Sequence, residues 1–188
     1  QGFINALRMG DVKPLIEKGW FKRAGMEKLF FARERTDKEW ETTLKEVFEN
    51  SSNIGTGKIS QVVGQIGLYK TIRSYGFGSN TGVDLAGEVP GMLSEPSLWS
   101  KSSLWNIPIG QGIAVTAMQL ACGISAVAND GVLMKPYIVG RIQDRKGELI
   151  KRFDPQPVRK VADKRTAKLL KEILAGVIEN GTGKNARI

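Results

Sequence analysis

The segment Asn50-Ser-Ser-Asn-Ile-Gly-Thr-Gly-Lys-Ile59 joins two stretches that are expected to be helical. Before it, Thr43-Leu-Lys-Glu46 has the capping-box pattern that begins a helix, and this short helix ends at Glu49. After it, a second helical stretch runs from about Ile54 to Tyr75, with glycines that break or kink it. Ser and Asn are residues that caps and turns select, so residues 51–53 alone favour a capping junction.

Two Gly-Thr-Gly-Lys strings, at 55–58 and 181–184, invite comparison with a phosphate-binding loop. That loop needs a glycine five residues before the Gly-Lys pair and a hydroxyl residue after the lysine. Neither string has that glycine, and the residues after the lysines are Ile59 and Asn185. Nucleotide binding is therefore not indicated by these strings.

The chain of 188 residues has no histidine and a single cysteine, Cys122. This composition excludes a Ser-His-Asp triad, a Cys-His dyad and mixed Cys/His zinc sites within the chain. It also excludes an intrachain disulfide and a CxxC pair. Acid-base chemistry near neutral pH would have to use carboxylate, lysine, serine or tyrosine side chains. We expect neither a metal nor a cofactor.

The formal net charge is +9, and residues 141–188 hold most of the excess, with 13 basic and six acidic side chains. Lys164, Lys168 and Lys171 share one face of an expected helix whose other face is apolar. This pattern is typical of a surface helix with a solvated basic side. Only Phe153 is available nearby for stacking, which argues against nucleic-acid binding. An anionic polymer or membrane surface remains an alternative partner.

Residues 76–112 are rich in glycine, proline and serine, which is typical of a long functional or folded-down loop. Thr116 is then expected to cap an apolar helix from Ala117 to Asn129, which Gly131 ends. The small residues of this helix predict that it is buried, with Cys122 as a core thiol.

Extended segments are expected at residues 132–134, 136–139, 142–144 and 148–153, with a hairpin turn at 145–147. Asp163 is expected to cap a last helix from Lys164 to Glu179. Helices come first, then a hairpin, then a helix, and this order predicts a single α+β domain.

Four blocks in chain order resemble the class B penicillin-binding proteins. The first block, Asn50–Ile59, is similar to the family's second active-site motif, Ser-x-Asn, and the second is the turn-rich segment Tyr75–Glu88. The third, Ile109–Gly131, is similar to the family's long signature. The fourth, Val177–Ala186, is similar to the segment before the third motif. Serine β-lactamases share the three motifs, but the stretch 76–131 is more similar to the transpeptidases. The cell-division enzymes are the most similar, and the elongation enzymes are close to them.

The resemblance implies the penicillin-binding protein and serine β-lactamase-like fold, here a helical subdomain with part of an antiparallel sheet. It implies serine acyl transfer between peptidoglycan stem peptides ending in D-Ala-D-Ala, with lysine in place of histidine as the base. In this family's chemistry Ser51 would belong to the proton relay, and Asn53 would hydrogen-bond the substrate amide.

The sequence departs from the family pattern in two places. No serine is followed by a lysine three residues later, and Lys-Thr-Gly does not occur. We therefore expect residues 1–188 to be one partial transpeptidase domain, truncated at both ends, with the nucleophile just upstream of a helix tail at residues 3–9. The chain alone should be inactive because the members of a catalytic unit act together.

The resemblance also implies partners and a location for the parent protein. Expected partners are stem peptides, β-lactams, a glycan polymerase and divisome proteins, with no nucleic acid. The domain would lie outside the cytoplasm in a parent anchored in the cytoplasmic membrane. Two alternatives stay open, which are a non-catalytic penicillin-binding-like sensor domain and an anionic-polymer binder that uses residues 141–188.

Overall fold

The computed structural model describes residues 44–187. The expected helix at residues 3–9 and the capping hydroxyl of Thr43 lie outside the described residues. Helices form the body of the molecule, and three two-stranded antiparallel sheets are found among the described residues. The mixture of helix and antiparallel sheet agrees with the α+β class that the sequence predicts.

The second predicted helical stretch is two helices, α6 (Asn53–Val63) and α7 (Gln65–Ser74), which follow the short helix of residues 44–49. The break falls at Gly64, whose φ of 74° is in the left-handed region that favours glycine. Gly76, after α7, also has a positive φ, as expected for the residue beyond a helix end.

α6 continues unbroken through Gly55 and Gly57, so the break expected from the glycines of this stretch does not occur at these two, which serve packing instead. A Cβ atom at Gly55 would overlap the side chain of Val47 in the short helix. A Cβ atom at Gly57 would overlap the ring of Trp105 in α8 (Ser103–Asn106). These glycines let α6 approach its neighbours closely on both sides.

The turn-rich region after α7 is anchored to the body through a buried side chain. It contains β1 (Met92–Leu93) and ends at β2 (Ile113–Ala114), and these two strands pair. Between them lie η1 (Pro96–Leu98), α8 and η2 (Ile107–Ile109). Gln119 is only 1% exposed and donates hydrogen bonds to the carbonyls of Ser79 and Pro90, at 2.7 and 2.8 Å. The region is thus folded down on the body.

Gln119 belongs to α9 (Ala117–Ala128), which begins with the predicted cap. The Thr116 hydroxyl accepts from the Gln119 amide, and the Gln119 side chain accepts from the Thr116 amide, which makes a capping box. The prediction that this helix is buried holds for one face only, since Leu120 is 50% exposed and Ile124 is 55% exposed.

The strand β3 (Val132–Met134) was predicted, but its partner was not. It pairs with β6 (Pro157–Lys160), a strand that sequence reasoning missed. Residues 136–139 form no strand, which corrects the second extended segment. Leu133 of β3, Ala126 of α9 and Val161 form the buried core cluster beside β6.

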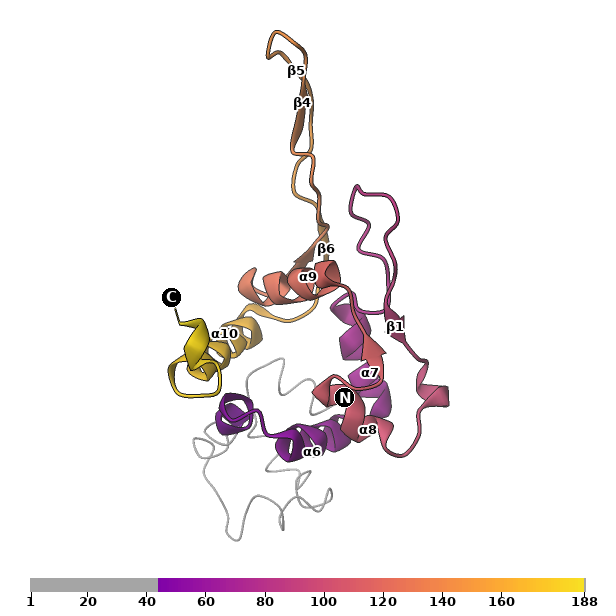
Figure 1. Ribbon diagram of the computed structural model, residues 1–188, viewed down its shortest axis with the longest axis vertical. Helices are drawn as coiled ribbons and strands as arrows, with labels where there is room; N and C mark the ends of the chain where they lie inside the picture. The colour runs from indigo at the N-terminus through magenta and orange to yellow at the C-terminus, as the bar shows by residue number, and fades with distance from the viewer. Residues whose placement is uncertain (1–43, 188) are drawn as a thin grey trace.

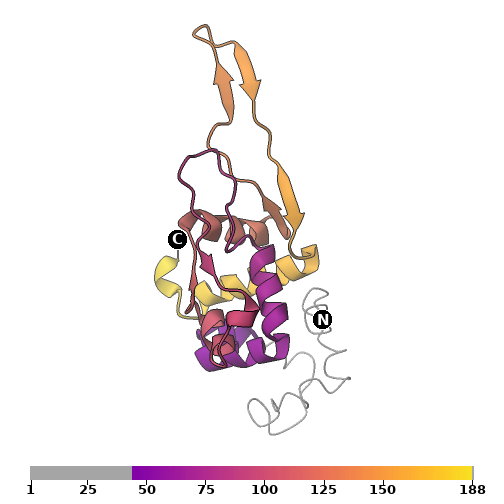
Figure 2. The same ribbon diagram turned by 90° about the vertical axis from the view of Figure 1, so that its right-hand side faces the viewer.

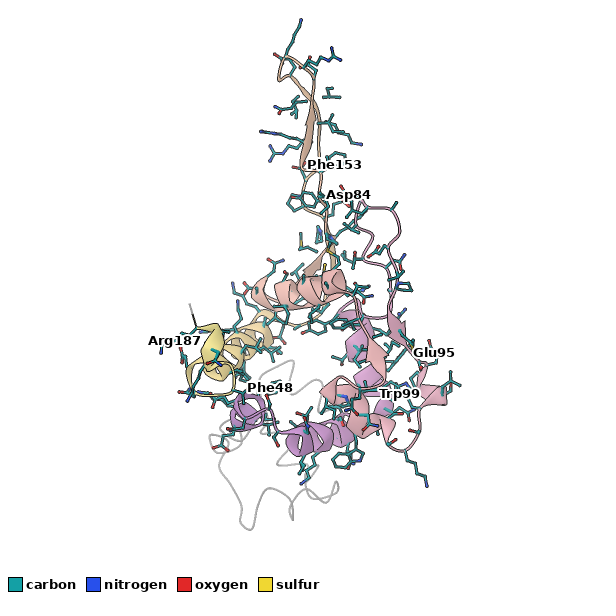
Figure 3. The ribbon with its side chains drawn as sticks, in the orientation of Figure 1. Phe48, Asp84, Glu95, Trp99, Phe153 and Arg187 are labelled. Carbon is teal, nitrogen blue, oxygen red and sulfur yellow. The ribbon has the colours of Figure 1, made fainter. Side chains whose placement is uncertain are left out.

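The predicted hairpin is β4 (Arg141–Gln143) paired with β5 (Leu149–Arg152). It projects from the body as a long arm, and all of its strand residues are exposed (Figures 1 and 2). At its base, the carboxylate of Asp84 accepts from the amides of Ile138 and Val139, at 2.7 and 3.0 Å. Figure 3 shows Asp84 in the turn-rich loop beside the hairpin stem.

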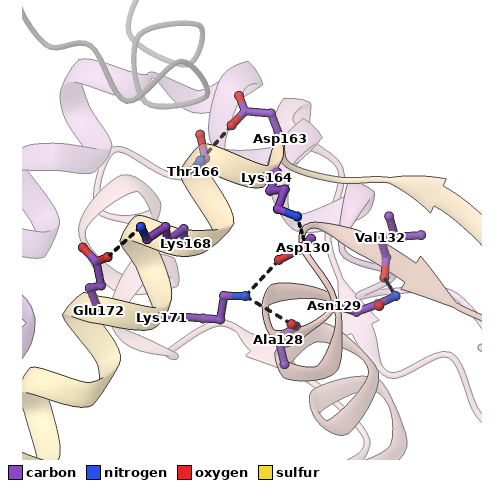
Figure 4. Close-up of polar contacts among 10 residues, drawn as sticks. All are labelled: Ala128, Asn129, Asp130, Val132, Asp163, Lys164, Thr166, Lys168, Lys171 and Glu172. Carbon is purple, nitrogen blue, oxygen red and sulfur yellow. Dashed lines mark hydrogen bonds and ion pairs between the residues drawn. The ribbon is translucent and has the colours of Figure 1, made fainter.

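The last helix, α10 (Lys164–Glu179), begins as predicted, because the Asp163 carboxylate accepts from the Thr166 amide at 2.7 Å. Two lysines of its basic face bind Asp130 at the end of α9, Lys171 at 2.9 Å and Lys164 at 3.1 Å (Figure 4). The hydrogen bonds from Lys171 and then Lys164 lower the pKa of the Asp130 carboxyl. Part of the basic face therefore ties α10 to α9.

On its other side α10 faces α6, α7 and the short helix across an apolar cavity of about 250 Å³. Phe48, Val63, Leu170 and Ile173 are among the side chains that line it. No helix between residues 44 and 187 is both long and apolar enough to cross a membrane.

Candidate active site

The predicted second motif forms the junction between the short helix and α6. The amides of Asn50 and Ser52 donate to the carbonyls of Glu46 and Val47, which closes the end of the short helix. Ser51 has a φ of 49°, a left-handed conformation that is uncommon for a residue with a side chain. The chain reverses at Ser51 and enters α6 two residues later.

The two adjacent serines have different environments. Ser52 is the N-cap of α6, and its hydroxyl accepts from the Gly55 amide at 3.1 Å. The hydroxyl of Ser51 is exposed and lies 3.2 Å from the hydroxyl of Thr182, which is 131 residues away in the sequence. The capping interpretation is therefore correct for Ser52, and it leaves the hydroxyl of Ser51 available for another role.

Asn53 is the first residue of α6, and it is exposed. Its side-chain amide has no hydrogen-bond partner among residues 44–187, so both its donor and its acceptor are available to a ligand. Ser51 and Asn53 thus come from the same short turn, on either side of the capping serine. Their catalytic roles remain predictions.

The chain after α10 folds back onto this junction. The Thr182 amide donates to the Glu49 carbonyl at 3.0 Å, and the Asn180 side chain lies 3.4 Å from a carboxylate oxygen of Glu49. A Cβ atom at Gly181 would overlap the backbone of Glu49, so the two segments meet at van der Waals distance. Figure 1 shows the short helix and the C-terminal turn side by side.

Sequence reasoning identified the block Val177–Ala186 but missed the contact that Thr182 makes with the motif. The string Gly181-Thr182-Gly183 gave a local turn signal, and no sequence signal connected it with Ser51. Rejection of a phosphate loop at this string agrees with its geometry, because the turn packs against Glu49.

Cys122 was predicted to be a core thiol, and it packs partly buried against the core cluster. Burial, and then the charge of Glu88, raise the pKa of its thiol. A raised pKa keeps the thiol protonated near neutral pH, which makes it a poor nucleophile. Cys122 lies in α9, outside the junction that carries the motif.

The comparisons with known proteins agree with this geometry. The penicillin binding protein transpeptidase domain matches residues 20–188, and the chain belongs to this family. The α+β fold is therefore that of a penicillin-binding protein transpeptidase domain, as the resemblance implied.

Among similar proteins, penicillin-binding protein PbpB of Mycobacterium tuberculosis is 35% identical over 153 residues, which are 78% of this chain and 22% of the relative. Stage V sporulation protein D of Bacillus subtilis is 34% identical over 145 residues, 77% of this chain and 22% of that protein. The chain spans about a quarter of the length of the curated relatives it matches.

Solved structures show the same fold. The crystal structure of penicillin binding protein 3 from M. tuberculosis complexed with aztreonam superposes with a TM-score of 0.70 at 34% identity, covering 77% of this chain and 34% of that one. The D,D-transpeptidase domain of a peptidoglycan glycosyltransferase from Eggerthella lenta gives a TM-score of 0.69 at 27% identity, covering 77% and 38%.

Proposed function

We propose that the complete protein is a peptidoglycan D,D-transpeptidase that cross-links stem peptides by serine acyl transfer during septal wall synthesis. The observation that carries the proposal is the junction of residues 50–53, in a chain that belongs to the transpeptidase family. This junction presents, on one turn, an exposed serine hydroxyl and an exposed asparagine amide that has no hydrogen-bond partner among residues 44–187.

The chemistry would proceed in two steps around this turn. A serine of a Ser-x-x-Lys motif, activated by its lysine, attacks the carbonyl carbon between the two D-alanines, and the terminal D-alanine leaves as an amine. The amine of a second stem peptide then displaces the enzyme serine from the acyl group. Ser51 would hand a proton to the departing amine, and Asn53 would hold the donor's amide in line for attack.

β-Lactams would act as mimics of the donor peptide, and a solved relative holds aztreonam in its complex. The proposal extends to the setting of the complete protein, which would expose this domain outside the cytoplasm from a membrane anchor and act with a glycan polymerase and divisome proteins. Support for the transpeptidase activity comes from E. coli FtsI, named a peptidoglycan D,D-transpeptidase, which is 30% identical over 92 residues, 49% of this chain and 16% of that protein.

The test is covalent labelling by a fluorescent penicillin, read after denaturing electrophoresis. The complete protein should carry one label per molecule, and the chain of residues 1–188 should carry none. A complete protein that binds the penicillin reversibly and takes no covalent label would contradict the proposal and favour the non-catalytic sensor domain. A stable label on residues 1–188 would show that a nucleophile lies within them.

A further inference from the structure

We propose that Thr182 is a positioning residue, which orients the hydroxyl of Ser51 for the proton relay. This inference rests on the proposed function, because it gives a supporting partner to a residue of that relay. The observation behind it is the 3.2 Å contact between the hydroxyls of Ser51 and Thr182, two residues 131 positions apart.

Ser51 needs such a partner because, in the part of the chain that the structure describes, its hydroxyl makes no other hydrogen bond. Its hydroxyl is exposed, and a serine side chain rotates among three staggered conformations. The neighbouring Ser52 cannot help, since its hydroxyl is occupied in capping α6. The left-handed backbone of Ser51 sets the direction of its Cβ, but the position of the oxygen depends on a hydrogen bond.

Thr182 is suited to supply that hydrogen bond, because its own position is fixed. Its amide donates to the Glu49 carbonyl, and the preceding Gly181 packs directly on the Glu49 backbone. Gly183 donates to the Val177 carbonyl at 3.0 Å, which closes the turn on the end of α10. Threonine is also β-branched, so its side chain has fewer conformations to choose among.

The hydroxyl pair leaves the chemistry of Ser51 intact. Each hydroxyl has one proton and two lone pairs, so Thr182 can donate to Ser51 and leave the serine proton and one lone pair free. A proton relay needs both groups, because the serine gives its proton to the leaving amine and uses the lone pair to accept a proton from the base. The same contact ties the segment before the third motif to the second motif.

The experiment measures acylation of the complete protein by a chromogenic cephalosporin in stopped flow, which separates the first-order acylation constant from the binding constant. We expect Thr182→Val, which keeps the shape and removes the hydroxyl, to slow acylation about threefold to tenfold with unchanged binding. Thr182→Ser should restore the wild-type constant. Thr71→Val is the matched control, at an exposed threonine whose hydroxyl donates to the Gly67 carbonyl within α7.

A double-mutant cycle separates positioning from a general loss of structure. In a Ser51→Ala background, Thr182→Val should cause no further slowing, because there is no hydroxyl left to orient. Three results would overturn the inference. Thr182→Val could slow acylation equally in the wild-type and Ser51→Ala backgrounds, it could leave the acylation constant unchanged, or Thr182→Ser could fail to restore that constant. Absence of acylation in the wild-type protein would instead overturn the proposed function.

Discussion

Replacing Gln119 should loosen the attachment of the turn-rich loop to the body of the domain. This side chain is 1% exposed and joins three backbone groups that are far apart in sequence. Its oxygen accepts from the Thr116 amide at 3.0 Å, and its nitrogen donates to the carbonyls of Ser79 and Pro90. Gln119→Met fills a similar volume without any of these hydrogen bonds.

The magnitude follows from the three groups that lose their partner. At about 1 kcal/mol for each group, Gln119→Met should lower the free energy of unfolding by roughly 3 kcal/mol. Gln119→Glu tests the geometry further. It keeps the oxygen that accepts from the Thr116 amide, but it replaces the donating nitrogen with a second oxygen that faces the carbonyls of Ser79 and Pro90. That carboxyl can fit only when protonated, so its pKa in the folded state should lie above its unfolded value of about 4.3.

The assay is urea unfolding of the complete protein at several values of pH. At pH values below its unfolded pKa, the introduced carboxyl is protonated in both states and fits the site. The decrease in the free energy of unfolding caused by Gln119→Glu should therefore be smallest near pH 4 and grow as the pH rises. Gln143→Met, in the exposed hairpin, is the control and should change stability by less than about 0.5 kcal/mol. A Gln119→Met protein as stable as this control, or a pH-independent Gln119→Glu, would refute the reasoning.

Two further predictions concern the packing of α9 on its neighbours. Lys171 and Lys164 lower the pKa of the Asp130 carboxyl from its ordinary value of 3.8. Their ion pairs with Asp130 therefore stabilise the fold fully at pH values above 3.8, and this stabilisation is lost as the pH falls through the lowered pKa. Asp130→Asn should therefore flatten the acid limb of a profile of melting temperature against pH, whereas Glu172→Gln, in an exposed pair, should leave it unchanged. Gly131 has a φ of 83°, and a Cβ there would overlap the Ala162 carbonyl, so Gly131→Ala should cost about 2 kcal/mol in urea unfolding. A Cβ atom at Gly140 would meet no atom within 4 Å, so Gly140→Ala should lower the free energy of unfolding by less than about 0.5 kcal/mol. Equal stability of the Gly131→Ala and Gly140→Ala variants would contradict this account.

Helix ends could be predicted from the sequence because their signals are local. Thr116 and Asp163 begin α9 and α10 through side-chain hydrogen bonds that reach only three residues along the chain. Gly76 and Gly131 follow helices with positive φ, a conformation for which glycine is the favoured residue. These features needed no knowledge of the tertiary structure.

Strand pairing was harder because it depends on distant partners. β6 begins at Pro157, and proline argues against a strand except at its first residue, where it stands here. β1 and β2 are two residues long, too short for any alternation of apolar and polar residues. The half-exposed face of α9 also has no local signal, because burial depends on what packs against the helix.

The site was predicted in part for the same reason. The motif at residues 50–53 is continuous, so its resemblance to the family was enough to predict roles for Ser51 and Asn53. Thr182 reaches the motif through the fold, and a contact between residues 131 positions apart leaves no mark in one sequence. The different hydrogen-bond environments of Ser51 and Ser52 also required the structure, since both are serines at a helix junction.

The most direct test of the account compares these two serines by acylation of the complete protein with penicillin. Ser51→Ala should slow acylation by at least about a hundredfold with little loss of stability, as expected for a proton-transfer residue that is exposed. Ser52→Ala should lower stability by about 1 kcal/mol through loss of the α6 cap and leave acylation within about threefold. Acylation of Ser51→Ala at the wild-type rate would contradict the central claim.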